Sequence, residues 1–112
     1  MVKKIIMPKH NNSAIPCTIL RGGTSKGVYL KESDLPADPE AREQAILKIF
    51  GSPDKRQIDG LGGADPLTSK VCIVGPAPKD NPRAKDAQLS YTFGQVEIDH
   101  PMVDLRSLCG NL

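Results

Sequence analysis

The chain has 112 residues, of which 38% are hydrophobic and 25% are charged, and this composition indicates a folded domain rather than a disordered segment. Its 15 basic and 13 acidic residues leave a net charge of only +2, which gives no reason to expect nucleic acid or an anionic membrane as a partner. No apolar run reaches the roughly 20 residues that a membrane span needs. We therefore expect a cytoplasmic protein.

The first half of the sequence predicts a hairpin. Residues 15–20 are mostly apolar, and residues 28–30 resume the same pattern. Between them, residues 21–27 contain three glycines, which is typical of a turn between two strands.

A helix is predicted next. Asp38 is a favourable N-cap, and Pro39 suits the first helical position because its missing N–H is not needed there. Gly51 is a typical stop signal. We expect a helix over residues 39–50.

The second half predicts strands separated by long loops. Residues 57–70 carry three glycines and a proline without periodicity, so we expect a structured loop with positive φ angles. Residues 71–74 form an apolar run typical of a buried strand, and residues 75–85 form a polar loop. Apolar residues alternate over residues 89–98, with an interruption at Gly94 that fits either a hairpin or one bulged strand.

The glycine-rich stretches do not have nucleotide-binding spacing. A P-loop needs Gly-Lys followed by a hydroxyl residue, but Lys26 and Lys70 each come after one. A dinucleotide fingerprint that starts at Gly60 would need glycine where Asp65 stands. Nucleotide binding is therefore disfavoured.

Residues 21–27 combine a guanidinium, an ammonium, two hydroxyls and glycines within one turn. Arginine can bind a carboxylate through two parallel hydrogen bonds, and glycine lets backbone N–H groups approach an anion closely. The same residues also fit an ordinary solvated turn, so both interpretations stay open.

Lys70 is a candidate base because it stands where the glycine-rich loop meets an apolar strand, a junction that often faces a cleft. A lysine is more often a solvated surface residue. A base role would require nearby positive charge or burial to favour the neutral amine.

Three cysteines, an odd number at wide spacings, argue against a disulfide framework and a zinc site, and His10 and His100 have no partners at ligand spacing. Cys17 and Cys72 lie in apolar runs and are expected in the core. Cys109 precedes Gly110-Asn111 in a sequence that suits the start of a helix, where unpaired N–H groups would acidify a thiol and could bind a carboxylate. A buried, inert cysteine fits this tripeptide as well.

Taken together, four motifs resemble the PrpF family, and they span most of the chain. They are IPCTILRGGTSKG at 15–27, QIDGLGG at 57–63, LTSKV at 67–71 and CGN at 109–111. The resemblance implies an α+β chain with the two-lobed diaminopimelate epimerase-like fold, in which each lobe is a curved mixed sheet around a central helix. Relatives are several times longer, so residues 1–112 are expected to be an incomplete N-terminal lobe that ends where the central helix begins, with the second lobe absent.

The resemblance also implies an activity, which is cofactor-independent isomerisation of aconitate-like unsaturated tricarboxylates by proton abstraction and an allylic double-bond shift. Lys70 matches the family's base and Cys109 the cysteine that faces the substrate. The expected substrate-binding residues are Arg21, Gly22, Gly23, Thr24, Ser25, Gly62, Gly63, Ser69, Gly110 and Asn111. Neither a cofactor nor a metal is expected.

Two further expectations concern an alternative function and self-association. A non-catalytic homologue that binds carboxylates or another chain is the alternative function. Uncovered sheet edges and apolar surface are expected to favour self-association.

Overall fold

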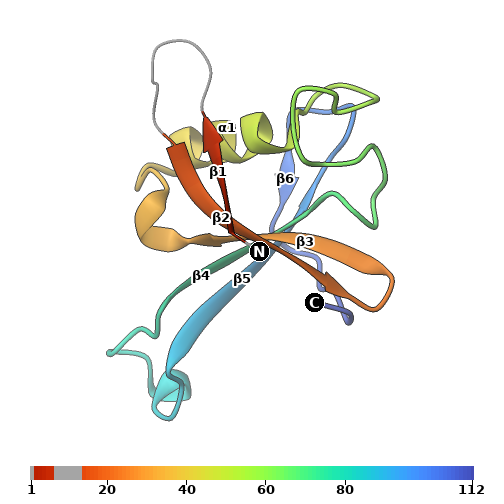
Figure 1. Cartoon of the computed structure of the whole chain (residues 1–112). Coiled ribbons are helices and arrows are strands. Elements are labelled where there is room, and N and C mark those ends of the chain that lie inside the picture. The colour runs from red at the N-terminus through yellow and green to blue at the C-terminus, as the bar shows by residue number, and fades with distance from the viewer. Residues whose placement is uncertain (1, 7–13) are drawn as a thin grey trace.

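The computed structural model describes residues 2–6 and 14–112, and His10 lies outside the described residues. Six strands form a single sheet, and one α-helix packs against it (Figure 1). In chain order the elements are β1 (Val2–Ile6), β2 (Ala14–Gly22), β3 (Ser25–Lys31), α1 (Pro39–Phe50), β4 (Lys70–Pro76), β5 (Leu89–Val96) and β6 (Val103–Asp104), with short 3₁₀ turns at Glu32–Asp34 and Pro82–Ala84. The α+β class is confirmed.

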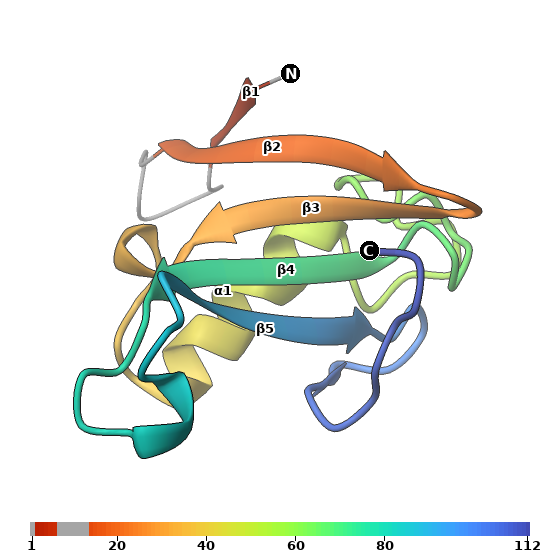
Figure 2. The same ribbon diagram turned by 90° about the horizontal axis from the view of Figure 1, so that it is seen from below.

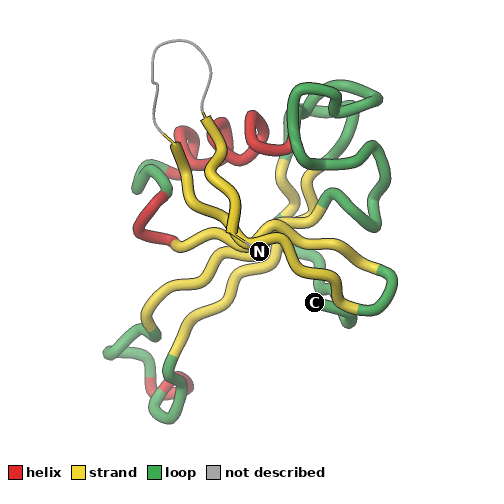
Figure 3. Tube along the Cα trace, viewed as in Figure 1, coloured by secondary structure: helices red, strands yellow, loops and turns green. Residues whose placement is uncertain are grey.

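The strands follow one another across the sheet in sequence order, from β1 to β6. Neighbouring strands are antiparallel except β3 and β4, which are parallel. A parallel pair needs a crossover connection, and here α1 and the loop that follows it provide one. Figure 2 shows that α1 lies behind one face of the sheet, and Figure 3 shows the long loop that returns the chain to β4.

The hydrophobic core lies between α1 and the face of the sheet that it covers. Side chains alternate between the two faces of a strand. Val28 and Leu30 of β3 and Val71 and Ile73 of β4 belong to the buried cluster. Their neighbours Gly27, Tyr29, Lys70 and Cys72 therefore face the other side of the sheet, which α1 does not cover.

The helix begins and ends where the sequence predicts. The Asp38 side chain accepts a hydrogen bond from Ala41 N at 2.9 Å, which satisfies one of the free N–H groups of the first turn. Gly51 ends the helix in the left-handed conformation with φ 83°, and its N–H donates to Leu47 O.

The hairpin at residues 15–30 is confirmed as β2 and β3, and the run at residues 71–74 as part of β4. The chain at Gly94 forms neither a hairpin nor a bulge, because β5 passes through it with continuous pairing to β4. A Cβ at this position would approach Val71 Cγ1 to 2.8 Å and Val103 Cγ1 to 2.9 Å. Gly94 is thus required by close packing rather than by a turn.

Two features at the ends differ from the sequence pattern. β1, which pairs with β2, carries no clear sequence signal and was not predicted. Residues 105–112 are described in full and contain no helical turn. Among the described residues, no helix is long and apolar enough to cross a membrane.

Phe50→Ala should lower the free energy of unfolding by about 3–5 kcal/mol, because the Phe50 side chain is fully buried between α1 and the sheet. Chemical denaturation followed by circular dichroism measures this loss. Lys48→Ala, on the exposed side of the same helix, is the control and should change stability by no more than about 0.5 kcal/mol. Equal losses for both variants would contradict this packing of α1 on the sheet.

Candidate active site

The parallel pairing of β3 with β4 places Lys70 on the face of the sheet opposite α1. Lys70 is the first residue of β4 and pairs with Gly27 of β3 and Gln95 of β5. The side chain is only 9% exposed, and its Nζ lies 5.7 Å from the centre of the Phe93 ring. Because Gly27 has no side chain, the space beside Lys70 stays open to the C-terminal segment.

Cys109 lies directly against Lys70 although 39 residues separate them. Lys70 Nζ donates a hydrogen bond to Cys109 Sγ at 3.3 Å, and Cys109 Sγ lies 3.8 Å from Ser25 Oγ. Ser25 is 1% exposed and starts β3. The structure thus brings the two predicted catalytic side chains together, with a hydroxyl beside them.

The thiol of Cys109 is acidic. Burial by itself raises its pKa, but hydrogen bonds from the backbone N–H groups of Asn111 and Leu112, and then those with the Lys70 and Ser25 side chains, lower the pKa from 9.0 to about 7. N–H groups that point back at a side chain two and three residues earlier are the arrangement of a helix N-cap. The sequence prediction of an acidified thiol is consistent with this geometry.

Asn111 joins the C-terminal segment to the hairpin turn. Its Nδ2 donates to Thr24 Oγ1 at 3.0 Å and lies 3.5 Å from Ser25 Oγ. A Cβ added at Gly22 would overlap the Asn111 carbonyl oxygen, and one at Gly23, where φ is 55°, would come within 2.9 Å of Asn111 Oδ1. The two glycines are therefore needed for the close approach of these segments.

Arg21 lies on the same hairpin but on the other face of the sheet. Arg21 pairs with Lys26, whereas Gly22 pairs with Ser25, and alternate residues of a strand point to opposite faces. Arg21 Nε donates to Gly23 O at 3.0 Å, so the guanidinium supports its own turn. Carboxylate binding by Arg21 stays a prediction, and the geometry gives it no direct place beside Lys70.

The glycine-rich loop packs against the hairpin and supports the start of β4. Lys26 binds it twice, through Nζ to Leu61 O at 2.7 Å and through its backbone N to Leu67 O at 2.8 Å. Gly63 has φ 76° and lies against Thr68 Oγ1. The Ser69 hydroxyl is fully buried and donates to Val96 O at 2.7 Å. The substrate-binding roles expected for Gly62, Gly63 and Ser69 stay predictions.

Sequence reasoning missed two polar residues in this region. Gln57 is buried inside the glycine-rich loop, and Gln95 Nε2 donates to Pro66 O at 2.9 Å and to Ser69 O at 3.0 Å. No local pattern distinguishes either glutamine from a solvated one. The expected positive φ is found at Gly63 but also at Gln57 (46°) and Ala64 (61°).

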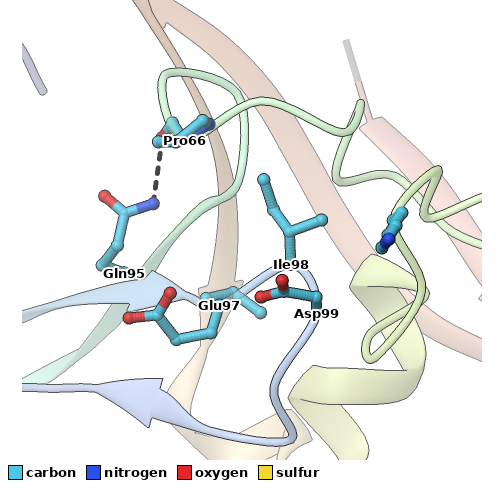
Figure 4. A pocket seen from close by; sticks show the side chains of 7 residues that line it. Pro66, Gln95, Glu97, Ile98 and Asp99 are labelled. Atoms are coloured by element: carbon cyan, nitrogen blue, oxygen red, sulfur yellow. Dashed lines mark hydrogen bonds between the residues drawn. The ribbon is translucent and has the colours of Figure 1, made fainter.

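A pocket of about 310 Å³ lies beside this loop but apart from Lys70 and Cys109. Figure 4 shows Gln95, Glu97 and Asp99 on its wall, with the Gln95–Pro66 hydrogen bond at its edge. Two carboxylates against one ammonium, Lys55, make it a poor site for a polycarboxylate. The Lys70–Cys109 pair is therefore the better candidate for such a substrate.

The remaining cysteines and histidines have other surroundings. Cys17 and Cys72 are buried, as expected, and burial is the main cause that raises the pKa of the Cys72 thiol. Cys72 does not lie in the α1-covered core, since its Sγ contacts Tyr91 Oη at 3.2 Å on the other face. His100 Nδ1 lies 2.8 Å from Asp99 Oδ1, and the described residues contain no cluster suited to a metal ion.

The arrangement is suited to proton transfer beside an anion. An amine and an acidic thiol in direct contact can exchange a proton, and nearby hydroxyl and backbone N–H groups can bind negative charge where it develops. Amine and thiol groups placed in this way are the kind of pair that general acid–base catalysis uses.

The sequence profile of the family described as PrpF protein matches residues 12–112. The chain is 58% identical over 98 residues to 3-methylitaconate isomerase of Eubacterium barkeri and 50% identical over 98 residues to 4-oxalomesaconate tautomerase of Pseudomonas putida, covering 88% of this chain in each case. It is 43% identical over 104 residues to 2-methyl-aconitate isomerase of Cupriavidus necator, again covering 88% of this chain. These matches cover 24%, 26% and 25% of the relatives.

A crystal structure of methylitaconate-delta-isomerase superposes with a TM-score of 0.79 at 60% identity, covering 87% of this chain and 24% of that one. The chain belongs to the PrpF family, as its motifs indicate. It spans about a quarter of the length of the curated relatives that it matches.

Alkylation of Cys109 by iodoacetamide should rise with pH around a midpoint near 7, because the thiolate is the reactive form and the pKa is lowered to about 7. Lys70→Ala removes one of the hydrogen bonds that lower this pKa, so the midpoint should move upward and the rate at pH 7 should fall. Peptide mass spectrometry separates Cys109 from the buried Cys17 and Cys72. An unchanged midpoint in Lys70→Ala would contradict the contact.

Gly22→Ala should displace the C-terminal segment, because the new Cβ overlaps the Asn111 carbonyl oxygen. We expect amide NMR shifts at Asn111 and Cys109 and a raised Cys109 alkylation midpoint. Gly110→Ala is the matched control, since nothing lies within 4 Å of a Cβ at Gly110. Equal perturbation by both substitutions would argue against the close approach.

Proposed function

We propose that this chain is the part of a cofactor-independent isomerase that supplies the acid–base pair for aconitate-like unsaturated tricarboxylates. The contact of Lys70 Nζ with Cys109 Sγ at 3.3 Å is the observation that carries the proposal. The names of its relatives, which include isomerases of methylitaconate and 2-methyl-aconitate and a tautomerase of oxalomesaconate, support the same chemistry.

The reaction needs only proton transfers. Lys70 Nζ takes a proton from the allylic carbon next to a carboxylate, and the electron pair left behind spreads over the allyl system and that carboxylate. The Cys109 thiol gives its proton to the other end of the allyl system, so that the double bond shifts by one position. Substrate and product have the same composition.

The direct contact between Lys70 and Cys109 lets the pair return to its starting protonation. After one turnover the pair is an ammonium and a thiolate, and transfer of one proton across the 3.3 Å contact restores the amine and the thiol. The proton that Lys70 takes thus replaces the one that Cys109 gives, and no external acid or base enters the balance.

Carboxylate binding falls to the groups around the pair. Thr24, Ser25 and the backbone at Gly22 and Gly23 lie next to Asn111, and Gly110 is open on the side where a Cβ would project. We place the carboxylate nearest the reacting carbon among these groups, where they can stabilise the developing anion.

As part of the proposal, the chain is an incomplete N-terminal lobe of a diaminopimelate epimerase-like fold.

Incubation of the protein at its natural length with cis- or trans-aconitate in deuterated water tests the proposal. We expect deuterium at the allylic position by NMR, and Lys70→Ala should slow its incorporation by about 10²–10⁴-fold because the base is removed. Lys48→Ala, on the exposed face of α1, should exchange at the unaltered rate. Exchange that persists unchanged in Lys70→Ala would remove the proposed base, and binding without exchange in the unaltered protein would favour a non-catalytic carboxylate-binding module.

A further inference from the structure

Gln57 occupies an unusual position for a polar residue with a long side chain. It is 1% exposed, and its backbone has φ 46°, in the left-handed region that non-glycine residues seldom adopt. A residue is kept in such a conformation only where its surroundings determine it. The side chain of Gln57 supplies the reason.

Every polar atom of the Gln57 side chain is used. Nε2 donates to Ser52 Oγ at 2.9 Å and to Ser69 Oγ at 2.9 Å, and Oε1 accepts from Ala64 N at 2.8 Å. Nε2 carries two N–H groups and Oε1 is an acceptor, so this is the full donor capacity of an amide.

The direction of these bonds is fixed by the next atoms in the network. Ser52 Oγ donates its hydrogen to Glu97 O at 2.5 Å, and Ser69 Oγ donates to Val96 O at 2.7 Å. Both hydroxyls therefore have only lone pairs left for residue 57, which must present two N–H groups. An amide of this length meets that requirement, whereas an apolar side chain offers no hydrogen bond to either hydroxyl or to Ala64 N.

The network joins the glycine-rich loop to the start of β4. At one end Gln57 holds Ala64, and a Cβ at Gly62 would overlap the Gln57 amide. At the other end Gln57 holds Ser69, the residue immediately before Lys70. The Ser69 carbonyl oxygen also accepts a hydrogen bond from Val96 N at 2.9 Å. The backbone from which the Lys70 side chain projects is thus anchored from two sides.

We propose that Gln57 is a positioning residue that fixes the backbone at Ser69 so that Lys70 Nζ meets Cys109 Sγ. Gln57 does not touch that pair and acts through Ser69. The inference deepens the proposed function and rests on it, because it concerns the same pair.

Gln57→Met tests this role, since methionine has a similar length, fills the same space and adds no charge that could act on the thiol directly. In this chain we expect the pH midpoint of Cys109 alkylation to rise by at least about half a pH unit, as in Lys70→Ala, because the Lys70 contact helps to lower the Cys109 pKa. The fraction of Cys109 present as thiolate at pH 6 would then fall about threefold. Combined with Lys70→Ala, Gln57→Met should add no further shift.

Two further variants separate positioning from general destabilisation. Ser69→Ala removes one partner of Gln57 without changing the charge and should shift the midpoint in the same direction, so it decides the question if Gln57→Met does not fold. Ile46→Val, in the core beneath the opposite face, should lower thermal stability and leave the midpoint unchanged. A purely structural role for Gln57 would make its variants behave like Ile46→Val.

The outcomes also separate this inference from the proposed function. A raised midpoint in Lys70→Ala with unmoved midpoints in Gln57→Met and Ser69→Ala would overturn the inference alone. Raised midpoints in all three, together with deuterium exchange that survives Lys70→Ala in the protein at its natural length, would uphold the inference and overturn the proposed function. Midpoints unmoved in all three would overturn the Lys70–Cys109 contact and with it both.

Discussion

The parallel pairing of β3 with β4 is the constraint on which the rest of the structure depends. It places Lys70 beside Gly27, whose missing side chain leaves room for the C-terminal segment and hence for Cys109. A parallel pair requires a crossover, and α1 serves as that crossover while it also covers the opposite face. Core and candidate active site thus arise from the same connection.

Local signals in the sequence predict much of this arrangement. The helix is predicted at both ends because Asp38 and Gly51 act through contacts within one turn, and the hairpin follows from its glycines. The prediction at Gly94 was wrong because a glycine required by packing looks the same in sequence as one required by a turn. The sequence of β1 does not predict a strand, because the element is recognised only by its pairing with β2.

The candidate site is predictable only in part for a related reason. Local position and the family motifs make Lys70 and Cys109 candidates in the sequence, but their contact joins residues 39 positions apart and follows from no local spacing. The orientation of Arg21 away from Lys70 depends on strand alternation, which the sequence shows only once the register is known. The sequence does not predict the burial of Gln57, because that burial depends on hydrogen bonds to Ser52 and Ser69, which lie in two different segments of the chain.

The alternation of side chains along β3 and β4 has a consequence for how this protein can change. On each strand one residue in two contributes to the packed core, and its neighbours lie on the opposite face of the sheet, where the thiol and the amine are found. A substitution on the site face therefore alters recognition or chemistry while the buried aliphatic residues keep their contacts. Residues on the site face can therefore vary without loss of the packed face, and the relatives of this chain are named for different substrates.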